Sequence, residues 1–189
     1  NIPIPNTIKF KLNNSDYNKY IKRSMKAYVD GEANNTNNRI VYDLARGTKD
    51  GIKKKYKIWT DADLILEDSL IKSKIRILGD GKDHLRLPFT SLKVKILDDS
   101  YYGIKRFNLF LPHTRKAENE VFWTLMLSFL DFPSLYTKMV TVDLNGKKYR
   151  AIFQEDATKE FLERNNITET VILKQNDFEF YLNNNEKDI

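Results

Sequence analysis

The chain has 189 residues, of which 41% are hydrophobic and 12% aromatic, enough to build one domain around a sizeable core. It contains no cysteine, which excludes disulfides, zinc–thiolate sites and thiol nucleophiles. The formal net charge of +6 is mildly basic, and no apolar run approaches the roughly 20 residues of a membrane-spanning helix.

The N-terminal segment, residues 1–38, predicts an arm followed by a helix. Apolar and polar residues alternate over 1–13, which indicates an extended strand-like arm. Ser15 is a suitable N-cap for a helix with apolar side chains at helical spacing, and Gly31 is expected to end it. The polar run at 34–38 is the predicted boundary between this segment and the rest of the chain.

Beyond residue 39 the pattern is mostly that of strands. Period-two alternation and β-branched residues predict strands at 39–45, 53–59, 73–79 and 90–97, with a weaker one at 170–174. Asn145-Gly146 is expected to join two more strands, 138–144 and 148–154, because both turn positions tolerate positive φ. Helices are predicted at 116–130 and 157–165.

The helix predicted at 116–130 decides the fold class. Its sequence VFWTLMLSFL is apolar on nearly every face, so we expect it to be buried on more than one side. The order of elements predicts an α+β domain over 39–175, an antiparallel sheet packed on this one buried helix, with an N-terminal helical extension. Residues 176–189 are expected to be a frayed tail or the start of a following segment.

Short chemical motifs are few. GDGK (79–82) is either a turn or a kinase-type glycine-rich loop over phosphates, and Asp83 excludes a Walker motif. Neither His84 nor His113 lies in a metal-binding pattern. The lysine run at 53–57 favours a solvated, lysine-edged surface over a nucleic-acid site.

A stronger signal comes from six segments: IRILGDGKDHL (75–85), SLKVKI (91–96), GIKRFNLFLPHTR (103–115), ENEVFWTLMLSFLDFPS (118–134), VTVDLNGKKYRAIFQED (140–156) and KEFLERNN (159–166). In this order they resemble the CotH family of spore-coat and secreted atypical protein kinases and the CotH-like proteins of bacterial envelope clusters. The resemblance covers roughly residues 73–175. It implies a protein-kinase-like fold in which this stretch is the small, N-terminal lobe.

The resemblance also implies a nucleotide-binding site. Gly79 and Gly81 fall at the family's glycine-containing turn, and Lys95 at the lysine of its arginine–hydrophobic–lysine strand. Lys93 stands where arginine is usual, which weakens bidentate phosphate recognition.

Two acids complete the implied set. Glu120 matches the family's helix glutamate, and Glu155 falls where the last strand enters the interlobe connection. A Lys95–Glu120 ion pair that positions phosphates is therefore expected, whereas the alternative is a solvent-facing lysine and an acid that complements the helix dipole.

The implied activity is phosphoryl transfer from ATP–Mg²⁺ to a protein or an envelope component. The family's catalytic and metal-binding Asp residues belong to the large C-terminal lobe, which is missing here, so this segment is expected to lack phosphotransferase activity on its own. The alternative function is a noncatalytic scaffold or interaction module of envelope or polysaccharide assembly. The resemblance favours an envelope-associated location, while the sequence itself leaves the compartment open.

Overall fold

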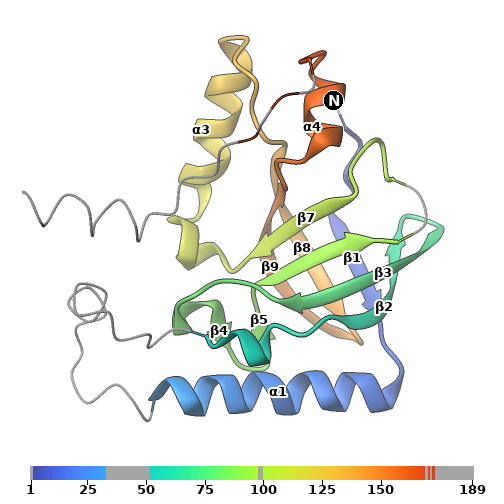
Figure 1. Ribbon diagram of the computed structural model, residues 1–189, viewed down its shortest axis with the longest axis vertical. Coiled ribbons are helices and arrows are strands. Elements are labelled where there is room, and N and C mark those ends of the chain that lie inside the picture. Colours follow the sequence, from blue (N-terminus) through green and yellow to red (C-terminus); the bar gives the residue numbers. More distant parts are fainter. Residues whose placement is uncertain (1, 33–51, 98–99, 169, 171, 173–189) are drawn as a thin grey trace, which may run out of the picture.

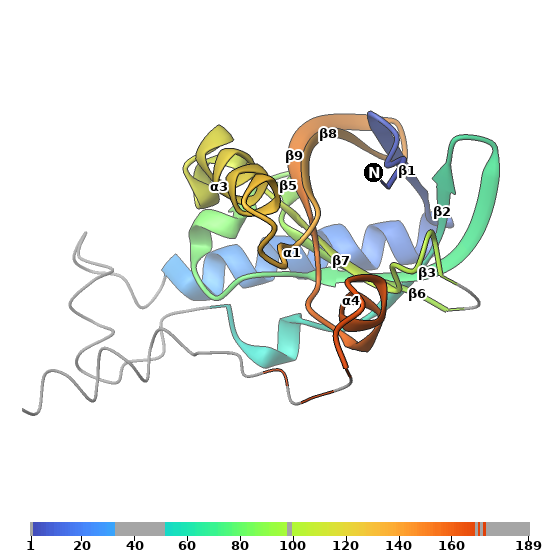
Figure 2. The same ribbon diagram turned by 90° about the horizontal axis from the view of Figure 1, so that it is seen from above.

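The computed structural model describes residues 2–32, 52–97, 100–168, 170 and 172. Seven of its strands form a closed barrel in the order β1-β2-β3-β6-β7-β9-β8 (Figures 1 and 2). Neighbouring strands are antiparallel, except that β1 runs parallel to β8 and so closes the barrel. The barrel strands are β1 (Thr7–Lys11), β2 (Thr60–Leu66), β3 (Ser69–Ile77), β6 (Leu92–Ile96), β7 (Arg106–Phe110), β8 (Thr137–Leu144) and β9 (Lys147–Glu155).

The remaining elements decorate the barrel. A two-stranded sheet is formed by β4 (Leu85–Arg86) and β5 (Phe89–Thr90). The helices are α1 (Asn14–Glu32), α3 (Glu118–Phe129) and α4 (Lys159–Arg164), with 3₁₀ turns η1 (Lys54–Tyr56), η2 (Lys82–His84) and η3 (Pro112–Arg115). In the described part of the chain, none of the helices has the length and apolarity needed to cross a bilayer.

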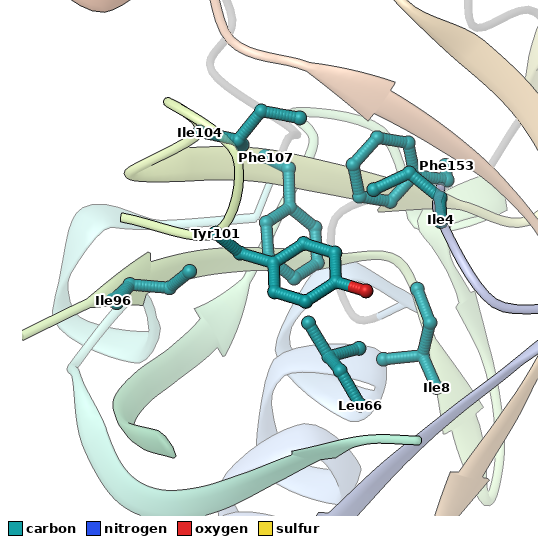
Figure 3. Close-up of a pocket in the computed structure, with 8 residues that line it drawn as sticks. All are labelled: Ile4, Ile8, Leu66, Ile96, Tyr101, Ile104, Phe107 and Phe153. Carbon is teal, nitrogen blue, oxygen red and sulfur yellow. The ribbon is translucent and has the colours of Figure 1, made fainter. Parts of the chain in front are cut away.

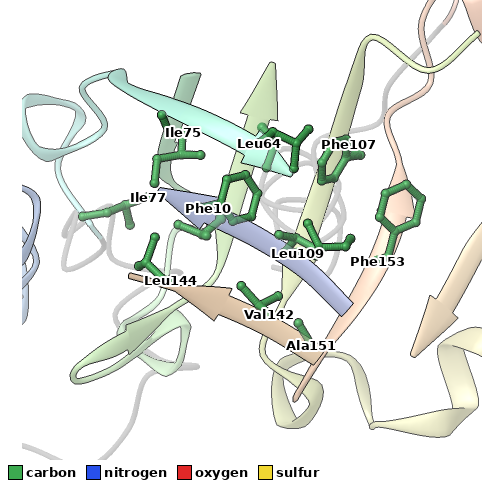
Figure 4. Packing of buried hydrophobic residues seen from close by; sticks show 14 of the residues in the cluster. Phe10, Leu64, Ile75, Ile77, Phe107, Leu109, Val142, Leu144, Ala151 and Phe153 are labelled. Carbon is green, nitrogen blue, oxygen red and sulfur yellow. The ribbon is translucent and has the colours of Figure 1, made fainter. Parts of the chain in front are cut away.

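The hydrophobic core lies inside the barrel. Alternate residues of each strand point inward, and Figure 4 shows Phe10, Leu64, Leu109 and Val142 meeting from four strands. A barrel of this size is narrow enough for side chains to fill it. At one end, eight apolar and aromatic residues close the interior without leaving room for a water molecule (Figure 3). The interior is therefore a packed core and not a ligand cavity.

The predicted fold class, a kinase-like antiparallel sheet packed on one buried helix, is wrong. The sheet closes on itself through β1, and its apolar faces meet each other inside the barrel. A helix is therefore not needed to cover the core, and α3 has no buried residue. The predicted burial of this helix on more than one side is therefore wrong, because the open sheet face that it was expected to cover does not exist in this structure.

Several predicted elements are present in the structure. The β8–β9 hairpin turns at Asn145 (φ 49°) and Gly146 (φ 85°), as the Asn-Gly dipeptide predicts. Asn145 also contacts β1, because its Oδ1 accepts a hydrogen bond from Leu12 N (2.7 Å) and its Nδ2 donates one to Leu12 O (2.9 Å). The strand predicted at 53–59 is instead η1 and irregular chain. Those predicted at 39–45 and 170–174 lie wholly or largely outside the described residues.

Helix α1 covers the barrel on the side away from α3 (Figure 1). Its N-cap is Asn13 rather than Ser15, since Asn13 Oδ1 accepts a hydrogen bond from Asp16 N (2.9 Å). Tyr20 is fully buried beneath the helix, and its hydroxyl shares a hydrogen bond with Thr90 Oγ1. Arg23 Nη1 donates to Ile58 O (2.8 Å). The N-terminal segment thus supplies both a barrel strand and a helix packed on the barrel.

Candidate functional site

The outer face of α3 is the most unusual surface of the domain. The helix turns Glu120, Val121 and Thr124 toward the barrel, and these are the only partly covered residues in it. Glu120 Oε1 accepts a hydrogen bond from Gln154 Nε2 on β9 at 2.6 Å. Of these three, only Glu120 makes a side-chain hydrogen bond to the barrel, while the large apolar side chains of α3 point outward, unlike those of an ordinary surface helix.

The exposed apolar residues of α3 and of the turn after it form one group, which we call the α3 patch. Phe129 is 83% exposed and Trp123 63% exposed. At about 200 Å² for each aromatic side chain, the aromatic residues alone expose roughly 500 Å², within the size range of the largest functional patches on monomers. The α3 patch consists of Phe122, Trp123, Leu125, Met126, Leu127, Phe129, Leu130 and Phe132.

Opposite charges flank helix α3 at its two ends. Lys116 lies two residues before α3 and Asp131 two residues after it, and both side chains are exposed. Both also have positive φ, 52° and 58°, where the chain enters and leaves the helix. Glu118, in the first turn, lies 3.8 Å from Arg150 of β9. The start of α3 thus carries Lys116 together with the Glu118–Arg150 contact, and Asp131 follows its end.

A second candidate surface lies on the outside of the barrel. Arg76, Lys93, Asn108 and Gln154 are direct neighbours across β3, β6, β7 and β9, so their side chains form one polar row. Lys93 Nζ lies 2.7 Å from a carboxylate oxygen of Asp156. At the β3 end of the row, the Arg76 guanidinium lies over the Trp59 ring, 5.1 Å from its centroid.

Two atoms in this polar row lack partners. Asn108 is only 8% exposed although it points away from the core, and its Oδ1 is buried without a hydrogen bond in the described part of the chain. Arg76 Nε is likewise buried and unpaired among these residues. Buried polar atoms are normally satisfied, so these two atoms are positions where an ordered water or another polar group is expected.

The two lysines of the predicted nucleotide site lie on this outer face, on either side of Val94. Lys95 is flanked across the sheet by Lys74 and Arg106, which makes a second, mainly cationic row, and Lys74 is paired with Asp61 at 3.3 Å. No salt bridge joins Lys95 to Glu120 among the described residues, and Glu120 instead bonds Gln154. Glu120 therefore contacts the end of the row that contains Lys93, and not the row that contains Lys95.

The glycine turn is packed against a histidine. A Cβ added to Gly79 would lie 2.0 Å from the His84 ring, and Gly79 has φ +96°, so glycine is required there. His84 Nδ1 is hydrogen-bonded to Ser91 Oγ at 2.9 Å, and burial holds the pKa of the imidazole below its ordinary value. A Cβ at Gly81 would approach Asp83 Oδ1 to 2.4 Å. The turn is therefore tightly folded onto its own side chains.

Glu155 has a structural partner on α4. It is 1% exposed, and both of its oxygens accept hydrogen bonds from the Arg164 guanidinium. Oε2 is also 3.3 Å from the Tyr136 backbone N–H. The pair fastens α4 to the end of β9. Ligand binding by Glu155, as by the two glycines, stays a prediction.

Sequence reasoning missed the polar row and the open side of α3. Asn108, Gln154 and Asp156 were within recognised segments, and the alternation of RFNLF (106–110) was a usable signal for an outward Asn at the centre of a strand. The described residues contain no group of three or more His, Cys, Asp or Glu able to hold a metal. A scan against protein-family models and a search of curated proteins both returned no match.

Proposed function

We propose that this domain is a protein-interaction module and that the α3 patch is its binding surface. The observation that carries the proposal is the orientation of α3, which has no buried residue and turns its large apolar side chains outward while Glu120 bonds the barrel. A noncatalytic scaffold of envelope or polysaccharide assembly, the setting that the CotH resemblance implies, agrees with such a surface.

The energetics of the patch support docking. Burying roughly 500 Å² of aromatic surface contributes about 12 kcal/mol at 25 cal/mol per Å². The estimated cost of association, about 4–15 kcal/mol, has the same magnitude. The aliphatic residues of the patch add to the favourable term, so burial of α3 can offset the cost of association. The filled barrel interior offers no comparable site for a small molecule.

Site-specific photo-crosslinking in the native host tests the proposal. A benzophenone amino acid would replace Trp123 in one variant and Leu70 in another, because both residues are 63% exposed but only Trp123 lies in the α3 patch. We expect discrete protein adducts from position 123 and only background from position 70. Equal, weak labelling at both positions contradicts the proposal.

A second candidate function, nucleotide binding, is favoured by the polar row. Lys93 and Arg76 provide positive charge for phosphate oxygens, and the buried, unpaired Oδ1 of Asn108 is a hydrogen-bond acceptor within the same row. The residues therefore fit a phosphorylated ligand. ATP–Mg²⁺ is the ligand that the CotH resemblance implies, and the magnesium ion would be held mainly by the phosphates.

Titration with ATP–Mg²⁺ tests this candidate and separates the two lysines. Lys93 is paired with Asp156 and adjacent to the open Asn108, whereas Lys95 lies in the cationic row. We expect Lys93→Ala to weaken binding about tenfold, the effect of losing one charged hydrogen bond, and Lys95→Ala to weaken it less. Absence of saturable binding, or equal binding by wild type and Lys93→Ala, contradicts it.

A further inference from the structure

We infer that the occupant of the α3 patch is a second copy of this chain, bound by antiparallel pairing of the two α3 helices about a two-fold axis. The inference rests on the proposed interaction function and names its partner. Three properties of the patch lead to it: its area, its charge order and the position of Trp123.

The area fits a symmetric dimer. Standard protein interfaces bury about 800 Å² on each partner. The aromatic residues of the α3 patch supply roughly 500 Å², and four aliphatic residues, three leucines and Met126, extend it. Because the patch follows a single straight helix, the surface that best matches its length and apolar character is another such helix.

The charge order selects the antiparallel arrangement. Lys116 and Asp131 stand at equal distances in sequence outside the two ends of α3. In an antiparallel pair, Lys116 of each copy meets Asp131 of the other, giving two attractive contacts. A parallel pair places lysine against lysine and aspartate against aspartate, which costs energy at both ends. In the described residues neither side chain forms a salt bridge within its own chain, so both charges remain available to a partner.

The centre of this arrangement falls on Trp123. The midpoint between Lys116 and Asp131 lies between residues 123 and 124, and Trp123 is exposed while Thr124 faces the barrel. Phe122 already packs edge-on against Trp123, with ring centroids 5.7 Å apart. Large aromatic residues near the geometric centre dominate binding energy in many interfaces. Two copies of Trp123 at the axis give the pair such a centre.

A charge exchange between the two ends tests the inference by analytical ultracentrifugation over a range of concentrations. We expect wild type to approach twice its monomer mass as concentration rises. Lys116→Asp and Asp131→Lys should each weaken self-association about tenfold, because each makes both end contacts repulsive. An equimolar mixture of the two variants should recover association as a heterodimer, since both contacts are again attractive.

A charge-matched control lies on α1. Lys26 is exposed there, and Lys26→Asp makes the same charge change on the opposite side of the barrel, so it should leave association as in wild type (Figure 1). Thermal melts of all variants check that the surface substitutions leave the fold intact. A wild type that stays monomeric at high concentration overturns the inference. So does a dimer whose association the two end variants do not change.

The outcome is separable from that of the proposed function. Crosslinks from position 123 to a different protein, with no self-association, reject the second copy but support the interaction module. Crosslinks between two copies of the chain support both. No crosslinks and no dimer contradict both.

Discussion

The two long helices of this domain differ in which side chains they turn toward the barrel. Helix α1 buries Tyr20, Ser24 and Ala27 against it and turns lysines such as Lys26 to the solvent. Helix α3 turns Glu120 and Thr124 inward and leaves its aromatic residues outside. One helix completes the fold, and the other brings an apolar surface that the fold does not use. This difference is the reason for proposing that α3 serves binding, whereas α1 serves stability.

The largest difference should appear when one aromatic residue is removed from each helix. Tyr20→Ala empties a fully buried site beneath α1, and we expect a loss of about 4 kcal/mol in the free energy of unfolding. Phe129→Ala removes an exposed ring and should change stability by about 0.5 kcal/mol or less in the isolated monomer. Urea denaturation at low protein concentration measures both. Comparable losses would show that α3 also stabilises the fold.

Helix α4 adds an intermediate case, because a buried ion pair attaches it in addition to the buried side chains of Phe161 and Leu162. Glu155→Gln leaves the Arg164 guanidinium without its buried counter-charge, and we expect a loss of roughly 3 kcal/mol in the free energy of unfolding. The control is Glu163→Gln on the same helix, which removes only an exposed contact with Lys159 at 3.6 Å. A Glu155→Gln protein as stable as this control would show that the pair does not hold α4.

Alkaline pH should lower the folding stability of the domain through Tyr20 of α1. Burial raises the pKa of Tyr20 from 10.0 to about 12, so the unfolded chain loses this proton before the folded one. The stability that Tyr20 contributes is complete below pH 10 and falls as pH rises toward 12, by roughly 3 kcal/mol at most. Burial also raises the pKa of Tyr149, so Tyr20→Phe should reduce the alkaline slope without removing it. Denaturation midpoints from pH 9 to about 12 give the slope, and an unchanged slope in Tyr20→Phe would contradict this assignment.

A smaller loss of folding stability is expected at acid pH, from His84 beside the glycine turn. Burial lowers the pKa of His84 below 6.5, so its contribution to stability is present above pH 6.5. That contribution is lost as pH falls from 6.5 through the lowered pKa, because the unfolded chain then binds the proton first. His84→Gln should flatten this part of the stability curve, whereas His113→Gln, at an exposed histidine, should leave it in place. A curve flattened only by His113→Gln would contradict the assignment.

The features that could be predicted from the sequence are those encoded by residues close together in the chain. The β8–β9 hairpin followed from Asn145-Gly146, since its turn chemistry and alternating strands lie within a few residues. Barrel closure needs β1 to pair with β8 across more than a hundred residues, and no local pattern encodes that parallel pairing. The strand β2 (Thr60–Leu66) was missed because its outward Asp61 and Asp63 lowered its apparent strand character.

The same distinction applies to the candidate sites. The apolarity of α3 was evident from its sequence, but composition does not say whether the covering surface belongs to the same fold or to a partner. Lys93 and Lys95 lie on one face of their strand, as the two-residue period of a β-strand requires. Their different neighbours, Asp156 for Lys93 and two cations for Lys95, depend on which strands lie beside β6 and so required the three-dimensional structure.

The most direct measurement of whether α3 is covered uses the absence of cysteine from this chain. Leu125→Cys on α3 and Val29→Cys on α1 would each introduce a single thiol at a side chain that is 60% exposed. In dilute purified protein both thiols should react with a polar maleimide at similar rates. In the native host, or at high protein concentration if the second copy is the partner, the thiol on α3 should be protected and the one on α1 should still react. Equal labelling of the two thiols under all of these conditions would contradict the account.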